Sequence, residues 1–393
     1  MRFTTDIRDT AYGGYGVGEL PDGRAAFIPF TVEGDRVEAE VIEEKKKMAF
    51  CRLIDVVTPS DKRVKEPHCP HVGRCGGCLF GHIDIEEQRR IKMRFIREAF
   101  ERGGLEIPEI GSYTGEDLGY RCRITFKVQD GRIGFYAFRT NDFIPIDDCP
   151  VTKSDLVQKA KLFAEKNRCC GDYDLYAVEN CEGETIAHMK GTCTHDIVFC
   201  AFDGIVFNEY RMGTDLLDIN TPMGRQRAGF ETFLQSNGIL GLHLQKGGVE
   251  AAGEGERALE LFCGSGFFTL GLAKNYRHVD AVEVSKEAVR LARTTGLENV
   301  EWTASDVDRF LNRYSERPDT IFVDPPRTGL SRKTLDYIKR SGANRLVYVS
   351  CNPATMARDA GRLRDLYTIE SMDFYDMFPH TYHVESLAVL KKK

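Results

Sequence analysis

The sequence has 393 residues and a mass of 44.4 kDa, which is enough for two or three domains of ordinary size. The composition is that of a globular protein, and the net charge of −6 excludes a uniformly basic, histone-like chain while leaving room for local basic patches. The start of the chain lacks the apolar core of a signal peptide, and no apolar run approaches about 18 residues, so we expect a cytoplasmic protein with no membrane partner.

The first 58 residues alternate between short apolar runs and turns. The predicted strands are 2–8, 15–20, 24–30, 35–43 and 49–57. Five short strands in so short a segment bury enough surface only by curling into a small barrel of the OB type. The run Lys45–Lys47 lies at a predicted hairpin tip, where it is either a solvated turn or a contact for nucleic acid.

A cysteine cluster follows on a glycine-rich loop, with the spacing Cys69-x5-Cys75-x2-Cys78. Cys149 is the natural fourth member, because the predicted hairpin over 120–146 can bring the chain back to this loop. Thirteen cysteines in a chain without a secretory signal favour metal binding or catalysis over a disulfide framework. Four thiolates can hold a tetrahedral zinc ion or an iron–sulfur cubane, and the spacing alone leaves both open.

The other cysteines, apart from Cys351, are interpreted as packing residues: Cys51, Cys122, Cys169, Cys170, Cys181, Cys193, Cys200 and Cys263. Four of them offer an alternative as a second ligand site: Cys169, Cys170, Cys181 and Cys193.

A helix is predicted over 84–102, with Asp84 and Glu87 as a capping box and Gly103 at its end. Its apolar stripe could pack on another domain. Its other face carries five cations, which are either an ordinary solvated face or a source of positive potential for RNA: Arg89, Arg90, Lys92, Arg94 and Arg97. The next predicted element is a hairpin that turns at Asp130–Gly131.

From about residue 230 the pattern changes to strands that alternate with helices. The apolar strands are 258–262, 279–284, 320–323 and 346–349. This alternation predicts a parallel, doubly wound sheet.

The turn after the first of these strands contains Gly264 and Gly266, which would allow a ligand to approach the backbone closely. Thr269 stands where a dinucleotide-binding fold needs a third glycine, and no Walker lysine is present. Glu283 follows the next strand, where it can accept both hydroxyls of a ribose, and Asp306 follows a third, where it can accept from an adenine amino group. Such a glycine loop with two acids suits S-adenosylmethionine, which has no phosphate.

Three further residues lie next to predicted strands of this sheet. Asp324, followed by two prolines, is a rigid acid that can orient a planar nucleobase amide. Cys351 ends a strand at the edge where α/β proteins bind ligands, so it is interpreted as a nucleophile rather than a packing residue. Glu385 precedes the last strand and is either a general base or an edge-strand charge.

The sequence resembles the TRAM-domain RNA 5-methyluridine methyltransferases over nearly its whole length. The resemblance rests on the cysteine pattern and on five motifs: 233–237, 261–266, 324–327, 350–353 and 383–386. It implies a multidomain α/β protein with three parts: an OB-like TRAM barrel that binds RNA (1–58), a central α+β domain with the cysteine cluster (59–228) and a Rossmann-like S-adenosylmethionine-dependent methyltransferase domain (229–393).

The same resemblance implies the site residues. Cys351 is the nucleophile, Glu385 the base and Asp324 the orienting acid. The cofactor contacts are Gln235, Phe262, Gly264, Gly266, Phe267, Glu283, Asp306 and Asp324. A [4Fe–4S] cluster is held by Cys69, Cys75, Cys78 and Cys149. Phe267 departs from the family, since many members have Asn there, and the change removes a polar contact to the cofactor.

The implied reaction is methylation of uridine C5, a transferase activity of class EC 2.1.1. A thiolate adds to C6, C5 takes the methyl group, and a base removes the C5 proton so that the thiol can leave. We expect a monomeric enzyme that acts on structured RNA, with 23S rRNA favoured over tRNA. The alternatives are the same chemistry on tRNA and a catalytically idle RNA-binding or chaperone protein; DNA cytosine methylation expects a different nucleophile loop.

Overall fold

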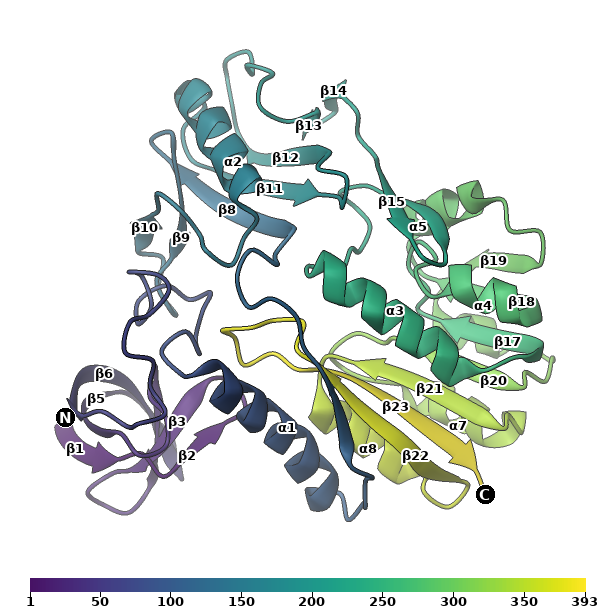
Figure 1. Ribbon diagram of the computed structural model, residues 1–393, viewed down its shortest axis with the longest axis horizontal. Helices are drawn as coiled ribbons and strands as arrows, with labels where there is room; N and C mark the ends of the chain where they lie inside the picture. Colours follow the sequence, from purple (N-terminus) through teal and green to yellow (C-terminus); the bar gives the residue numbers. More distant parts are fainter. The chain divides into compact units, whose positions relative to one another are not determined.

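The computed structural model describes residues 1–393, and the chain forms two compact units (Figure 1). The first unit comprises Met1–Phe95, Gly134–Pro150 and Phe378–His383. The second comprises Ile96–Ile133, Val151–Met377 and Val384–Lys393. Neither unit is a contiguous piece of the chain. None of the helices combines the length and the apolar character that a membrane-spanning segment requires.

The first unit begins with a six-stranded sheet in the order β1-β5-β6-β4-β3-β2. Its strands are β1 Arg2–Asp6, β2 Asp9–Ala11, β3 Tyr15–Glu19, β4 Ala25–Pro29, β5 Arg36–Glu44 and β6 Met48–Thr58. The prediction of one strand over 2–8 was wrong, because the backbone changes partners at its end. The N–H of Ile7 donates to the carbonyl of Asp35 (2.8 Å), and the N–H of Arg8 donates to that of Val17 (2.9 Å).

Helix α1 runs over Ile85–Arg102, and Asp84 caps it as predicted, accepting from the N–H of Glu86 at 3.0 Å. Neither alternative for the cationic face, a solvated face or a source of positive potential for RNA, fits two of its five residues. Lys92 is fully buried and donates to the carbonyl of Phe378 at 2.9 Å, and Arg94 donates to that of Thr10 at 3.0 Å. These cations therefore stabilise the first unit rather than form an open basic face.

The second unit contains a sheet in the order β8-β11-β12-β13-β14. Its strands are β8 Arg123–Gln129, β11 Tyr173–Glu179, β12 Thr185–Gly191, β13 Gly204–Phe207 and β14 Tyr210–Gly213. Helix α2, Ser154–Lys166, contributes a buried apolar face, and β15 Leu217–Thr221 pairs with β16 Gly224–Ala228. The predicted turn after β8 is confirmed, since Asp130 and Gly131 both have positive φ. Strands β9 Arg132–Tyr136 and β10 Phe143–Pro145 follow it, and the chain from Gly134 to Pro150 belongs to the first unit.

A larger, eight-stranded sheet has the order β19-β18-β17-β20-β21-β23-β22-β7. Its strands are β7 Ile110–Tyr113, β17 Gly255–Leu261, β18 Tyr276–Glu283, β19 Val300–Ala304, β20 Thr320–Val323, β21 Arg345–Ser350, β22 Tyr367–Tyr375 and β23 Glu385–Lys392. Strands β17 to β21 are parallel, as predicted. The prediction of an entirely parallel sheet was wrong, because β23 runs antiparallel to both of its neighbours.

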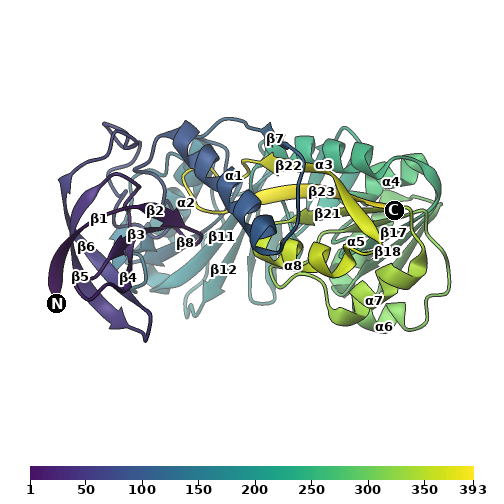
Figure 2. The same ribbon diagram turned by 90° about the horizontal axis from the view of Figure 1, so that it is seen from below.

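Helices cover both faces of this sheet (Figure 2). Helices α3 Gly238–Ala252 and α4 Thr269–Asn275 lie on one face, and α7 Arg332–Ser341 and α8 Pro353–Leu363 lie on the other. Short helices α5 Lys286–Ala292 and α6 Val307–Leu311 complete the alternation. The reversal of β23 has a direct consequence: its first residues lie beside the last residues of β21, with Ser386 opposite Ser350.

Candidate active site

The glycine loop connects β17 to α4. Phe262, Gly264 and Gly266 all have positive φ there, at 65°, 55° and 93°. A Cβ on Gly264 would meet no other heavy atom within 4 Å, whereas one on Gly266 would lie 2.7 Å from the ring of Trp302. Gly264 therefore leaves open space in front of the backbone, and Gly266 is required by the close packing of Trp302.

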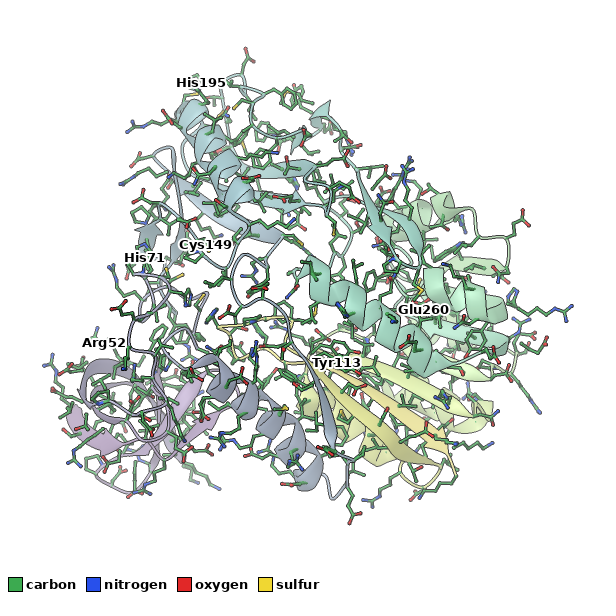
Figure 3. The ribbon with its side chains drawn as sticks, in the orientation of Figure 1. Arg52, His71, Tyr113, Cys149, His195 and Glu260 are labelled. Carbon is green, nitrogen blue, oxygen red and sulfur yellow. A yellow bond between two sulfur atoms is a disulfide. The ribbon has the colours of Figure 1, made fainter.

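Acidic side chains surround this loop. Glu283 at the end of β18 accepts from the N–H of Gly264 at 3.1 Å and from that of Ser285 at 2.8 Å. Glu260 of β17, labelled in Figure 3, is almost fully buried and accepts from the hydroxyl of Thr269 at 2.5 Å. Burial raises the pKa of Glu260 to about 8, and the nearby acids add to the effect. Sequence reasoning missed Glu260, because it lies within a buried strand rather than after one.

Asp306 has a structural role in addition to its predicted one. It is the N-cap of α6, and its carboxylate accepts from the N–H of Arg309 at 3.0 Å. The residue is exposed, at the end of the strand next to β18. Its contact with a cofactor stays a prediction.

Gln235 and Phe267 line one cavity of about 290 Å³ in the second unit. Asn237 caps α3 through the N–H of Leu240 at 3.0 Å, and the side chain of Gln235 packs against Gly241 one turn into that helix. Glu283, Asp306 and Asp324 do not line this cavity, so the predicted cofactor residues divide between it and the glycine loop.

The three predicted catalytic residues come together at one edge of the large sheet. Cys351 directly follows β21, Asp324 directly follows β20, and Glu385 begins β23. Because β23 is antiparallel to β21, Glu385 lies beside the strand end that carries Cys351. The sulfur and the two carboxyl groups are close enough to alter one another's protonation.

Burial raises the pKa of the Cys351 thiol to about 11, and the charges of Glu385 and Asp324 add to this effect. Burial also raises the pKa of Asp324 to about 7. Glu385 is only 7% exposed, and burial followed by the Asp324 charge holds its pKa well above the ordinary range. Burial at this site therefore disfavours the charged forms of both Cys351 and Glu385.

Arg327 opposes these shifts. Its guanidinium hydrogen-bonds to the Cys351 thiol, and its charge lowers the pKa of both Cys351 and Glu385. The side-chain amide of Asn352 donates to the carbonyl of Arg327 at 3.0 Å and so fixes the backbone there. Sequence reasoning did not place Arg327 among the site residues. The contact between Arg327 and the Cys351 thiol depends on how β20 and β21, which precede these two residues, pair with each other.

A buried acid supports the loop that carries Arg327. Asp359 of α8 is fully buried and accepts from the N–H of Leu330 at 2.7 Å and from the hydroxyl of Tyr348 at 3.0 Å. Its neighbour Arg358 donates to the carbonyl of Thr328 at 3.0 Å. These contacts hold the segment after Asp324 in one conformation, and no local sequence pattern marks them.

The cysteine loop lies in the first unit, with Cys69, Cys75 and Cys78 partly buried. The sulfur of Cys69 accepts from the N–H of His71 at 3.5 Å, and that of Cys75 accepts from the N–H of Gly77 at 3.5 Å. Backbone N–H groups directed at cysteine sulfurs stabilise thiolate charge and occur around metal clusters.

Cys149 belongs to the same unit as the other three cysteines (Figure 3). The chain reaches it through β9 and β10, and Ala137 between these strands forms an antiparallel bridge with Cys75. The N–H of Gly76 also donates to the carbonyl of Tyr136 at 3.2 Å. The segment before Cys149 is therefore tied to the cysteine loop, as expected if all four thiolates share one ligand.

Two other cysteines form a disulfide, Cys170 with Cys193, so their interpretation as packing residues was wrong. Cys170 precedes β11 and Cys193 follows β12. These strands are antiparallel with Tyr173 opposite Gly191, so the two flanking cysteines meet at the same end of the pair. By contrast, Cys51 is a buried core residue, as predicted.

Comparisons with known proteins find RNA methyltransferases among the relatives of this chain. A family model described as tRNA (Uracil-5-)-methyltransferase matches residues 205–310 and 306–393. The chain is 30% identical to the 23S rRNA (uracil(1939)-C(5))-methyltransferase RlmD of Vibrio parahaemolyticus, over 93% of this chain and 91% of the relative. It is 29% identical to an uncharacterized RNA methyltransferase of Aquifex aeolicus over 98% of each. It is also similar to a solved structure, the crystal structure of Pyrococcus abyssi tRNA (uracil-54, C5)-methyltransferase in complex with S-adenosyl-L-homocysteine. The TM-score is 0.79 and the identity 25%, and the match covers 99% of this chain and 100% of that one.

Proposed function

The chain belongs to the RNA 5-methyluridine methyltransferase family, and from that premise we propose which residues carry out the reaction and which RNA it modifies. The enzyme is an RNA uracil-C5 methyltransferase of class EC 2.1.1, and S-adenosylmethionine is its methyl donor. The position of Cys351 beside Glu385 at the edge of the large sheet is the observation that carries the proposed mechanism.

The glycine loop fits this donor in two respects. Gly264 faces open space, and the groups around the loop are acids rather than the lysine or the row of N–H groups that phosphates require. An acidic surrounding suits a ligand with a positive sulfonium and ribose hydroxyls. The proposed contacts are Gln235, Phe262, Gly264, Gly266, Phe267, Glu283, Asp306 and Asp324.

The raised pKa values of Glu260 and Asp324 predict a pH-dependent affinity for the donor. A bound cation favours the ionised form of both acids, so binding of the donor releases protons. The affinity should therefore rise by roughly tenfold as the pH rises through the pKa of Asp324, about 7, and that of Glu260, about 8. Isothermal titration at pH 6 and pH 9 measures this change. S-adenosylhomocysteine is the matched ligand, because it has the same α-amino group without the sulfonium. An equal pH dependence for both ligands would contradict the prediction.

In the proposed mechanism, the Cys351 thiol releases its proton to solvent, and the resulting thiolate adds through sulfur to C6 of the uridine, which places negative charge on C5 and the adjoining carbonyl. S-adenosylmethionine supplies an electrophilic methyl group for C5 when it is bound. Glu385 then takes the proton from C5, and the C6–sulfur bond breaks to restore the ring and the thiolate. Arg327 supports both residues, because its positive charge favours the thiolate of Cys351 and the carboxylate of Glu385. Asp324 orients the amide edge of the base.

We also assign a [4Fe–4S] cluster to Cys69, Cys75, Cys78 and Cys149. Two features support the fit: four thiols in one compact unit, and N–H donors directed at two of the sulfurs. The spacing of these cysteines differs from that of radical S-adenosylmethionine enzymes, so the cluster has a structural or RNA-facing role and no part in generating radicals.

We propose a separate role for each of the three predicted domains. Residues 1–58 form a TRAM barrel that binds RNA, 59–228 hold the cluster, and 229–393 bind the donor and carry out the chemistry. We propose a monomer that acts in the cytoplasm, where its RNA substrates are found.

The proposed substrate is a uridine of 23S rRNA. Relatives that are 30% identical over more than nine-tenths of this chain carry that name. A tRNA uridine is the second candidate, because the similar crystal structure is of a tRNA (uracil-54, C5)-methyltransferase.

Mass-spectrometric mapping of 5-methyluridine tests the substrate. rRNA and tRNA from cells with and without the gene should differ at one 23S rRNA uridine, and the purified protein should restore it in vitro. A change confined to tRNA would select the second candidate. No change in either RNA, with Cys351 intact, would favour the catalytically idle RNA-binding alternative.

A further inference from the structure

A second cavity, of about 410 Å³, lies wholly within the first unit, and none of the residues assigned above to the donor or to catalysis lines it. Glycines of the cysteine loop form one side of it, and aromatic rings and one cation form the rest. Its main lining residues are Gly76, Gly77, Tyr15, Phe138, Arg139 and Tyr382. The volume falls in the range of ordinary ligand sites.

Arg139 is held in an unusual position at this cavity. It has a φ of 58°, which is rare for a residue other than glycine, at the tip of the turn between β9 and β10. Its guanidinium carbon lies 4.7 Å from the ring centroid of Phe50, 5.3 Å from that of Tyr15 and 5.8 Å from that of Phe138. The side chain is nevertheless exposed, and no carboxylate lies within ion-pair distance of it.

Backbone contacts fix the turn that presents Arg139. The N–H of Ala137 donates to the carbonyl of Asp142 at 2.9 Å, which closes the turn. The N–H of Phe138 donates to the carbonyl of Arg74 at 2.9 Å, which joins the turn to the cysteine loop. The backbone of the turn that carries Arg139 is therefore held by the loop that carries the cluster cysteines.

The surroundings of the cavity extend this aromatic and cationic character. The ring of Tyr382 lies 4.3 Å from that of His383 and 5.6 Å from that of Tyr12. Lys45, from the predicted basic hairpin tip, has its ammonium group 4.9 Å from the ring centroid of Phe50. Lys45 and Arg139 therefore both contact the ring of Phe50 next to the cavity.

We propose that this cavity binds one unpaired nucleotide of the RNA substrate, outside the catalytic pocket. The base stacks on the aromatic rings that line the cavity, and the outward N–H groups of Arg139 bind the adjoining phosphate. Aromatic stacking together with a planar guanidinium is the combination by which proteins hold single-stranded RNA. A protein partner would require a broader apolar surface, whereas this site is a small cavity with an unpaired cation. The inference rests on the proposed function only in taking RNA as the substrate.

The test measures RNA binding directly. Fluorescence anisotropy of a labelled single-stranded RNA of about 20 nucleotides gives the affinity at several salt concentrations. Arg139→Ala should weaken binding about tenfold and reduce the salt slope by about 0.7, the value for one phosphate contact on a single strand. Arg139→Lys should restore the slope but not the full affinity, because the ammonium group lacks the planar fork.

Two further variants separate the stacking from the charge. Tyr382→Leu should weaken binding without changing the salt slope. Arg277→Ala is the control, since Arg277 is an exposed arginine outside the proposed RNA-binding barrel that pairs with Glu256 at 3.5 Å and does not line the cavity. It should leave the RNA affinity within about twofold of the wild type, as expected for an exposed ion pair.

The outcomes distinguish this proposal from the proposed function. An enzyme that methylates RNA but whose Arg139→Ala variant binds RNA like the wild type would overturn the nucleotide site. Equal losses for Arg139→Ala and Arg277→Ala would overturn it too, because the effect would then be one of general charge. A protein that fails to methylate RNA, yet loses RNA affinity only with Arg139→Ala, would support the site and refute the proposed function.

Discussion

Replacing Cys351 with alanine is expected to lower the methylation rate by about 10⁴-fold or more and to abolish any covalent protein–RNA adduct. The neighbouring hydroxyls of Ser350 and Ser386 are much weaker nucleophiles than a thiolate, so they should not replace Cys351 in saturating the 5,6 double bond of the base. Transfer of labelled methyl groups to RNA measures the rate, and denaturing gel electrophoresis detects the adduct. Cys169→Ser is the matched control, because Cys169 is an exposed free thiol distant in sequence from the site.

Glu385→Gln should have a different effect. The thiol can still add and C5 can still be methylated, but the C5 proton remains, so the methylated adduct should accumulate instead of disappearing. Normal product formation by Cys351→Ala would refute the nucleophile, and unimpaired turnover by Glu385→Gln would refute the base.

The same assay checks the protonation of the thiol. Because the pKa of Cys351 is about 11, the thiolate fraction should increase about tenfold per pH unit between pH 7 and 9, and the rate of adduct formation should follow it. Arg327→Gln removes the charge that lowers this pKa, so it should slow adduct formation, and a higher pH should partly restore the rate. A rate independent of pH would show that bound RNA, rather than the free protein, sets the thiol's ionisation.

Anaerobically purified protein should be brown and contain about four iron atoms per chain, as expected for a cubane held by four cysteines. Cys75→Ser or Cys149→Ser should remove the colour and most of the iron. Because Cys75 bridges to Ala137 and Cys149 follows β10, loss of the cluster should also make the first unit more sensitive to proteolysis.

Absorption spectroscopy and metal analysis check this prediction, with Cys200→Ser as a control for a thiol outside the cluster. A colourless protein with one zinc ion per chain would replace the cubane with a tetrahedral site. Full iron content in Cys149→Ser would remove that residue from the ligand set.

The part of the site that could be predicted from sequence consists of residues that directly follow predicted strands. Asp324 and Cys351 each follow a short apolar run, and parallel strands bring their carboxyl ends to one edge, so their proximity follows from the pattern. The role of Glu385 could not be derived in the same way. An apolar strand has the same pattern in either direction, and only the antiparallel course of β23 places Glu385 next to Cys351.

Other features depend on contacts between distant parts of the chain, which a local pattern does not contain. Asp359 looks like an ordinary helix residue, yet it is fully buried beneath the loop that carries Arg327. Lys92 looks like part of a solvated face, yet its amine reaches a carbonyl nearly three hundred residues away. The disulfide between Cys170 and Cys193 follows from the register of two strands rather than from the spacing of the cysteines.

Strand β7 has a consequence for how the chain is made. It is the outermost strand of the large sheet and pairs in parallel with β22, with Ile110 opposite Met372. Because more than 250 residues separate the two strands in the sequence, β22 leaves the ribosome long after β7 does. During most of translation the segment around Ile110 has no native partner, although the strands β17 to β20 can already associate. Contacts between residues so far apart form slowly, and an unpaired edge can accept the wrong strand. We therefore expect the late pairing of β7 with β22, rather than the assembly of the central strands, to set the time at which the newly made enzyme becomes active.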